Sequence, residues 1–132
     1  MMVVDTSAVM ALLEDEADAD AITQALEQAD ERLLSAVSLL EAGMLATSRK
    51  GAAGRQQLDA LIAAAEFEVV AFDAEQAWVA CLAFERYGKG RHPAALNVGD
   101  CAVYALAATR ALPLLFKGQD FACTDLVSAW PR

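Results

Sequence analysis

Four acidic residues lie beside or within strongly apolar stretches of this chain, where an isolated charge has little structural use: Asp5, Glu41, Asp100 and Asp120. A buried carboxylate is destabilising unless it is paired with a cation or holds a metal ion. Too few Lys and Arg residues lie nearby in the sequence to pair all four acids. Four carboxylates that converge from distant segments would form an all-oxygen site for Mg²⁺ or Mn²⁺. Such a site suits the hydrolysis of phosphodiesters.

Each acid taken alone also has an ordinary structural explanation. Asp5 precedes a helix as an N-cap, and Asp100 falls in a first helical turn, where a carboxylate favours the helix dipole. Asp120 lies in a turn, and the nearby Asp125 shares that ambiguity, so either acid could complete the set. Glu41 is the most informative, because it falls inside an apolar stripe formed by residues 37, 40, 44 and 45. A solvated helix face does not explain an acid in that position.

Apolar segments and capping residues predict strands that alternate with helices. Strands are expected at residues 2–5, 32–34, 68–72 and 113–116, with a last short strand at 126–127. Helices are expected at 6–14, 17–29, 36–49, 54–65, 74–86 and 98–110, the third ended by Gly51. This order predicts an α/β fold with a mostly parallel central sheet of four to five strands flanked by helices. Ligands of such sheets bind beyond the carboxyl ends of the strands, where Asp5 and Asp120 would both lie.

Length and composition predict one domain over residues 1–132, because 57% of the chain is hydrophobic. Its apolar runs are too short to span a bilayer, and no Lys or Arg precedes Arg32, so we expect a cytoplasmic protein without a secretory leader. The three cysteines form no CxxC motif and are expected to be buried, reduced thiols. A single histidine, His92, argues against a His/Cys zinc site and against a Ser-His-Asp triad.

The formal charge of −9 is concentrated at the N-terminus. Residues 1–31, called the acidic lobe below, carry nine acids and no base, whereas the remaining ten acids are balanced by all ten bases. The negative charge is therefore a local feature and does not exclude a nucleic-acid substrate elsewhere on the surface. The acidic lobe is either a solvated face or a docking surface for a basic partner.

The order of these motifs resembles the PIN-domain nucleases, and more closely the VapC toxins of bacterial VapBC toxin–antitoxin pairs. The resemblance covers nearly the whole chain and rests on residues 4–8 (Val-Asp-Thr-Ser-Ala), 35–41 (Ser-Ala-Val-Ser-Leu-Leu-Glu), 96–101 (Leu-Asn-Val-Gly-Asp-Cys) and 114–121 (Leu-Leu-Phe-Lys-Gly-Gln-Asp-Phe). Residues 87–92 also fit one VapC subgroup. Each motif is short, but four of them in this order and spacing are specific.

The resemblance implies a PIN-like fold and a Mg²⁺- or Mn²⁺-dependent endoribonuclease. Such a toxin would hydrolyse RNA, for example tRNA or rRNA, with a water activated by one or two metal ions. The family's acids correspond to Asp5, Glu41 and Asp100, and less closely to Asp120. Asp5 and Asp100 would bind the metal directly, and the other two directly or through water. Ser7 or Thr6 corresponds to the hydroxyl that holds a metal-bound water.

The resemblance also implies partners. The family forms homodimers and toxin–antitoxin hetero-oligomers, and the C-terminal tail of a VapB-type antitoxin places an Arg at the acidic site. We expect the acidic lobe to take part in that contact and no membrane to be involved.

Basic residues near the expected crevice are candidates for contact with the RNA backbone. Lys117, in the turn before Asp120, is the first candidate, and Lys89 and Arg91, in the loop before the 98–110 helix, are the next. Solvated loop charges are the alternative explanation for all three.

Other enzyme classes fit the motifs less well. A receiver domain would need a pair of acids after the first strand, and a haloacid-dehalogenase phosphatase would need Asp-x-Asp where this chain has Asp5-Thr6-Ser7. The alternative that remains is a catalytically silent PIN-fold module that binds RNA or protein.

Overall fold

A parallel sheet forms the centre of the structure, a computed structural model in which residues 1–130 are described. Its four strands are β1 (Met2–Val4), β2 (Arg32–Ser35), β3 (Phe67–Val70) and β4 (Leu114–Leu115). They lie in the order β3-β2-β1-β4, and each neighbouring pair is parallel, with Val3 opposite both Leu33 and Leu114. The predicted α/β fold with a parallel central sheet is therefore confirmed, and the carboxyl ends of β1, β2 and β4 meet at one edge.

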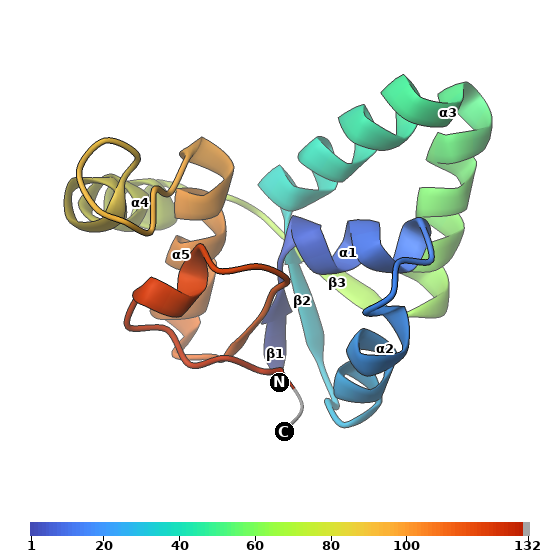
Figure 1. Ribbon diagram of the computed structural model, residues 1–132, viewed down its shortest axis with the longest axis horizontal. Helices are drawn as coiled ribbons and strands as arrows, with labels where there is room; N and C mark the ends of the chain where they lie inside the picture. The colour runs from blue at the N-terminus through green and yellow to red at the C-terminus, as the bar shows by residue number, and fades with distance from the viewer. Residues whose placement is uncertain (131–132) are drawn as a thin grey trace.

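Helices cover both faces of this sheet (Figure 1). On one face lie α1 (Thr6–Leu13), α2 (Ala19–Glu27) and α3 (Ala36–Ala64), and on the other lie α4 (Ala74–Tyr87) and α5 (Val98–Arg110). A short 3₁₀ helix, η1 (Phe121–Cys123), follows β4. Successive strand residues point to opposite faces. Val4, Leu34 and Leu115 accordingly pack with the α1–α3 layer, while Val3, Leu33 and Leu114 pack with the α4–α5 layer.

Short polar residues start four of the helices, as the sequence predicts. Asp5, Ser35, Asp73 and Asn97 each accept a backbone N–H of the first turn of α1, α3, α4 and α5. Such caps satisfy donors that have no partner within the helix. For α1 the cap is Asp5, so this carboxylate has a structural role as well as any chemical one.

A sharp bend divides α3 into two arms at Gly51, the residue predicted to end the first of two helices. Gly51 has φ 61° and ψ −146°, a conformation that a residue with a Cβ rarely adopts. The second arm turns back beside the first, and an added Cβ at Gly54 would lie 2.9 Å from the Cβ of Lys50. The bend thus folds the chain back toward β3.

Two features predicted from the sequence are absent from the described residues, namely a strand at residues 126–127 and burial of all three cysteines. Residues 126–127 form no strand, because the two-residue β4 offers only an isolated bridge between Leu114 and Ser128. Of the three cysteines, only Cys101 is buried, whereas Cys81 and Cys123 are exposed; all three are unbridged. No helix within residues 1–130 is both long and apolar enough to cross a membrane.

Candidate active site

The four acids singled out in the sequence come from four segments that end or begin near the carboxyl edge of the sheet. Asp5 directly follows β1, Glu41 lies in the second turn of α3, Asp100 in the first turn of α5, and Asp120 just before η1. Their charges act on one another: Glu41 raises the pKa of Asp5, and Asp5 and Asp120 raise the pKa of Asp100. The fold therefore brings all four into one electrostatic group.

Asp5 is the most enclosed member of the group, with 6% of its surface exposed. Burial raises the pKa of its carboxyl group, and the charge of Glu41 adds to that rise. Hydrogen bonds from Ser7 act in the opposite direction and lower the pKa of Asp5. The backbone N–H and the hydroxyl of Ser7 both donate to Asp5 Oδ2, at 3.1 and 2.5 Å. Two donors on Oδ2 fix the orientation of the carboxylate and stabilise its charged form.

Glu41 is half-buried at the start of α3. Burial raises the pKa of its carboxyl group, and the charge of Asp100 adds to the rise. The hydroxyl of Thr6 donates to Glu41 Oε1 at 3.0 Å. On the other side the carboxylate lies against Gly99 of α5, so closely that a Cβ there would be 2.6 Å from Glu41 Cδ. Glu41 is thus held between the first turns of two helices.

Asp100 combines a structural and an electrostatic role. It forms a capping box with Asn97: the Asp100 N–H donates to Asn97 Oδ1 at 2.9 Å, and the Asn97 N–H donates to Asp100 Oδ2 at 3.1 Å. Partial burial raises the pKa of its carboxyl group to about 6, with further contributions from the charges of Asp5 and Asp120. Strongly shifted carboxyl groups of this kind gather at functional sites.

The structure separates Asp120 from Asp125, which the sequence left as alternatives. Asp120 is exposed and close enough to raise the pKa of Asp100. Asp125 instead accepts a hydrogen bond from the Tyr104 hydroxyl at 2.6 Å and lies 3.6 Å from Arg86. These contacts tie the C-terminal segment to α4 and α5, so Asp120 is the better candidate for the fourth acid.

The donor set fits a hard divalent cation, because it consists of carboxylate oxygens that repel one another and that a cation would neutralise. In the arrangement described for residues 1–130, however, no three acidic, histidine or cysteine side chains stand ready to hold a metal ion together. Glu41 is turned to Thr6 and Asp100 to the backbone of Asn97. Glu41 Oε2 and Asp100 Oδ1 take no part in these hydrogen bonds, so a cation would draw the side chains together while Thr6 and Asn97 keep their contacts.

Glu41 lies among the four acids, but for a different reason from the one that the sequence suggests. Its apolar stripe was expected to face the core, but Leu40 and Met44 are 61% and 62% exposed. The buried side of this arm consists of small residues, among them Ser38, Ala42 and Ala46. Small side chains allow α3 to pack closely, so the large apolar residues remain outside.

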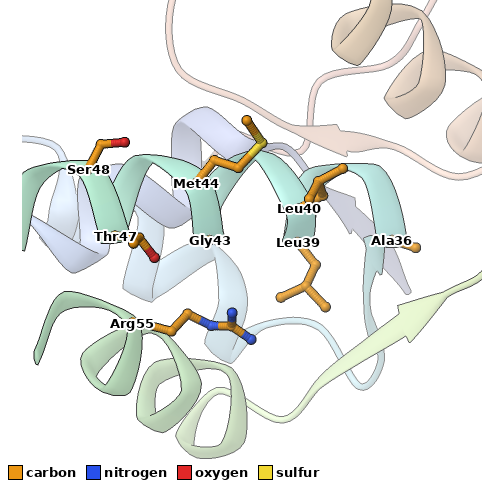
Figure 2. Close-up of a pocket in the computed structure, with 8 residues that line it drawn as sticks. All are labelled: Ala36, Leu39, Leu40, Gly43, Met44, Thr47, Ser48 and Arg55. Carbon is orange, nitrogen blue, oxygen red and sulfur yellow. The ribbon is translucent and has the colours of Figure 1, made fainter. Parts of the chain in front are cut away.

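These outward residues border a groove of about 530 Å³ on α3. Figure 2 shows Leu39 and Arg55 pointing into the space between the two arms, with Leu40 and Met44 on the first arm. The Arg55 guanidinium is within 3.2 Å of Asp59 on its own arm. On the first arm the lining changes from apolar, at Leu39, Leu40 and Met44, to polar, at Thr47 and Ser48, and on the second arm it is charged.

The basic residues proposed for RNA contact differ in their surroundings. Lys117 forms ion pairs with Glu16 and Asp18 of the acidic lobe. Arg91 lies over the ring of Phe84, with 5.8 Å between its Cζ and the ring centroid, and Lys89 is exposed. Lys117 is therefore the least available of the three for a phosphate.

Gly99 is a residue that the sequence analysis did not single out as part of the site. Its signal was a glycine in a first helical turn, directly before a candidate ligand, where alanine would favour the helix. The structure explains it, since the Glu41 carboxylate occupies the space of a side chain at this position.

We expect Gly99→Ala to lower RNA cleavage about tenfold or more without lowering stability, because Glu41 must move while the helix gains an alanine. The flexible end of Glu41 can yield, so the fold is retained. Gly43→Ala is the matched control, since an added Cβ there meets only Arg55 at 3.8 Å. Cleavage rates and thermal melts of the two variants check this; wild-type cleavage by Gly99→Ala would contradict it.

Comparison with known proteins places this geometry in a family. The PIN domain family model matches residues 2–126. The chain is 47% identical over 127 residues to "Ribonuclease VapC" of Mycolicibacterium smegmatis, covering 96% of this chain and 98% of that protein. It is 48% identical over 132 residues to "Ribonuclease VapC28" of Mycobacterium tuberculosis, covering 99% of both. The chain therefore belongs to the PIN-domain family and, within it, to the VapC ribonucleases.

Solved structures agree with the fold. The toxin VapC20 of Mycobacterium tuberculosis, described as cleaving the sarcin-ricin loop, superposes with a TM-score of 0.81 at 19% identity, covering 99% of this chain and all of that one. A toxin–antitoxin complex from Klebsiella pneumoniae gives a TM-score of 0.74 at 18% identity, with full coverage of both chains. At such identities the likeness concerns the fold alone.

Proposed function

We propose that this chain is the ribonuclease toxin of a VapBC toxin–antitoxin pair, and that Asp5, Glu41, Asp100 and Asp120 form its catalytic, metal-dependent site. The observation that carries the proposal is the convergence of these acids at the carboxyl edge of the sheet, where burial, together with their mutual repulsion, raises the pKa values of Asp5, Glu41 and Asp100. Helix capping accounts for Asp5 and Asp100 taken singly, but it does not account for four acids at one edge of the sheet, so a functional cation is the physical reason to keep the group together. Relatives named ribonucleases over nearly the full length support the same conclusion.

The residues of the chain divide the work of phosphodiester hydrolysis. Mg²⁺ or Mn²⁺, when bound, would act as a Lewis acid that lowers the pKa of water and stabilises the leaving oxygen. Asp5 and Asp100 would hold the cation, with Ser7 fixing Asp5. Glu41 would accept the proton of the attacking water, since burial raises its pKa and Thr6 fixes its position. Asp120, which is exposed, would complete the negative field at the mouth of the site.

Cleavage of a pool of structured cellular RNAs by the purified protein tests this function. We expect discrete cuts with Mg²⁺ or Mn²⁺ in tRNA or rRNA, and none with EDTA. Cytoplasmic RNA is the proposed substrate, which makes the cytoplasm the proposed place of action. Metal binding without cleavage of any RNA, in a preparation free of antitoxin, would instead support a silent PIN-fold binding module.

The antitoxin is the second proposed partner. Exposed acids of the acidic lobe, including Asp15, Asp20 and Glu27, offer a surface for a basic segment. The outward side chains Leu40 and Met44 lie on the same arm of α3 as Glu41, so an apolar contact there would bring the segment to the acidic site. An arginine from that segment would neutralise the carboxylates in place of the metal.

A second copy of the chain is the proposed partner of the apolar face formed by α4 and the start of α5. Trp78, Leu82 and Val98 are 74%, 63% and 86% exposed. Beside them lies an apolar groove of about 710 Å³ lined in part by Phe72, Phe84 and Val98. Exposed apolar area of this kind marks an interface in proteins that remain soluble.

We expect Phe84→Glu to weaken the homodimer at least tenfold, since an aromatic side chain in an apolar groove is a typical anchor. Light scattering over a concentration series would show twice the mass of one chain for the wild type and a shift to the single chain for the variant. Lys89→Glu, a charge change in the neighbouring exposed loop, should leave the association unchanged. An unchanged dimer in Phe84→Glu would place the interface elsewhere.

A further inference from the structure

Lys117 is held by acids from the opposite end of the chain. Its ammonium group forms ion pairs with Glu16 and, at 3.5 Å, with Asp18. The three side chains are 37%, 33% and 41% exposed, so the pairs are partly shielded from water. Their partner segment is itself fixed, because the Glu16 N–H donates to the Ala11 carbonyl and the Ala19 N–H to the Glu16 carbonyl. Lys117 is thus attached to a defined point between α1 and α2.

The main chain of the same residue is attached to the candidate active site. The Lys117 N–H donates to Ser7 Oγ at 2.9 Å, and the Ser7 hydroxyl donates to Asp5 Oδ2 at 2.5 Å. Since Ser7 Oγ accepts from Lys117, its own proton is directed at Asp5. A loss of the first hydrogen bond would free the hydroxyl to rotate away from the carboxylate.

Lys117 connects the turn that carries Asp120 to α1 and to the acidic lobe. Gly118, with φ 98°, turns the chain directly after Lys117, and Asp120 follows two positions later. In the described part of the chain, the hydrogen bonds that join residues 117–120 to α1 and to the acidic lobe all involve Lys117. Its ion pairs therefore add to the packing of Phe116 against Phe121, whose ring centroids lie 5.5 Å apart, in supporting the Ser7 hydrogen bond and the position of Asp120.

We propose that Glu16, Lys117 and Asp18 form a positioning clamp that keeps Ser7 directed at Asp5 and Asp120 beside Asp100. The inference rests on the proposed function, because it gives the clamp a role in the metal site. It also replaces the role expected from the sequence, in which Lys117 contacts an RNA phosphate. The positive charge of Lys117 is already balanced by two acids, which leaves the backbone N–H as its link to the chemistry.

The two roles of Lys117 make opposite predictions for its acidic partners. If Lys117 binds a phosphate, removing the acids frees the lysine and strengthens RNA binding. If it is part of a clamp, removing the acids has the same effect as removing the lysine. The variants are therefore Lys117→Met, which keeps the apolar stem, the double variant Glu16→Gln with Asp18→Asn, and the combination of all three substitutions.

The test uses the full-length protein without RNA and Mn²⁺ as the probe. We expect Lys117→Met and the double variant each to weaken Mn²⁺ binding about fivefold, as the loss of partly shielded ion pairs would, and the combination to be no worse. Hydrogen exchange of the residue-117 amide in the metal-free protein should speed up to a similar extent in all three. Glu14→Gln is the matched control, since Glu14 pairs with Arg49 away from the turn.

The outcomes separate this proposal from the proposed function. Unchanged amide exchange and Mn²⁺ binding in the double variant would overturn the clamp, as would additive losses in the combined variant. Tighter RNA binding by the double variant, with weaker binding by Lys117→Met, would restore the phosphate contact. A wild-type protein that cuts no RNA would contradict the proposed function, while the exchange of the residue-117 amide would still decide on the clamp.

Discussion

Asp5→Asn is expected to abolish RNA cleavage, by at least about a thousandfold, and at the same time to make the metal-free protein more resistant to heat. The activity is lost because an amide cannot replace a charged ligand of a divalent cation. The stability rises because burial and the charge of Glu41 both disfavour the charged form of Asp5. Asparagine is also a good N-cap and can keep accepting the two hydrogen bonds from Ser7.

The opposite signs of the two effects make the experiment decisive. If Asp5 served only as a helix cap, its replacement would lower the stability of the protein or leave it unchanged. Any loss of RNA cleavage would then come with a loss of stability. For Asp5→Asn we expect a rise in Tm of about 2–5 °C without metal, together with the loss of cleavage. Asp100→Asn should also lose cleavage, with a smaller gain in Tm because its carboxylate favours the N-terminus of α5.

The control is Asp59→Asn, which removes an exposed acid paired with Arg55 on the second arm of α3. Cleavage by this variant should equal that of the wild type. Cleavage assays and thermal melts in EDTA on the three variants give both readouts. Asp5→Asn that still cuts at the wild-type rate, or that melts earlier than the wild type, would contradict our assignment of this residue.

Features set by local sequence could be predicted well. The caps Asp5, Ser35, Asp73 and Asn97 act within three residues of themselves, so a short polar residue before an apolar run is enough to locate them. The sequence likewise predicts that Gly51 ends a helical arm, because a glycine after a helical segment is a local signal for a helix end. The short strand expected at residues 126–127 failed because a strand needs a partner of sufficient length, and β4 has two residues.

Features set by tertiary packing could not be predicted in the same way. Helical spacing shows that a helix has an apolar face, but not that another element covers it. Leu40 and Met44 form such a face and are exposed, so the apolar stripe does not account for the position of the candidate site residue Glu41. Its position follows instead from the start of α3 at the end of β2, which brings the second turn of the helix to the carboxyl edge of the sheet.

Contacts between distant segments explain what the sequence left open. The choice between Asp120 and Asp125 depended on Tyr104, which lies 21 residues before Asp125 and holds it with a hydrogen bond. The contact between Gly99 and Glu41 joins α5 to α3, and the ion pair between Lys117 and Glu16 spans about a hundred residues. The sequence shows each of these residues, but no pattern within one segment predicts which distant residue it contacts.

Removal of the metal and a change of pH should act on the same carboxylates. The pKa of Asp100 is raised from 3.8 to about 6, and those of Asp5 and Glu41 are also raised. The folded protein therefore binds more protons than the unfolded chain between about pH 4 and pH 6. The contribution of these groups to stability is fully present below pH 4 and is lost as the pH rises through about 6. In EDTA, Tm should accordingly fall between pH 5 and pH 7.

Added Mn²⁺ should reverse this trend, because the cation competes with protons for the same oxygens. Affinity is expected to rise about tenfold per pH unit below pH 6 for each proton displaced, and to level off above it. The Mn²⁺-induced rise in Tm should therefore grow from pH 5 to pH 7, and EDTA should abolish cleavage at every pH. Thermal melts with EDTA or Mn²⁺ across this range provide the measurement.

A metal-induced rise in Tm that does not depend on pH would mean that the cation binds away from these acids. In Asp5→Asn the pH dependence should shrink, since one of the competing carboxylates is gone.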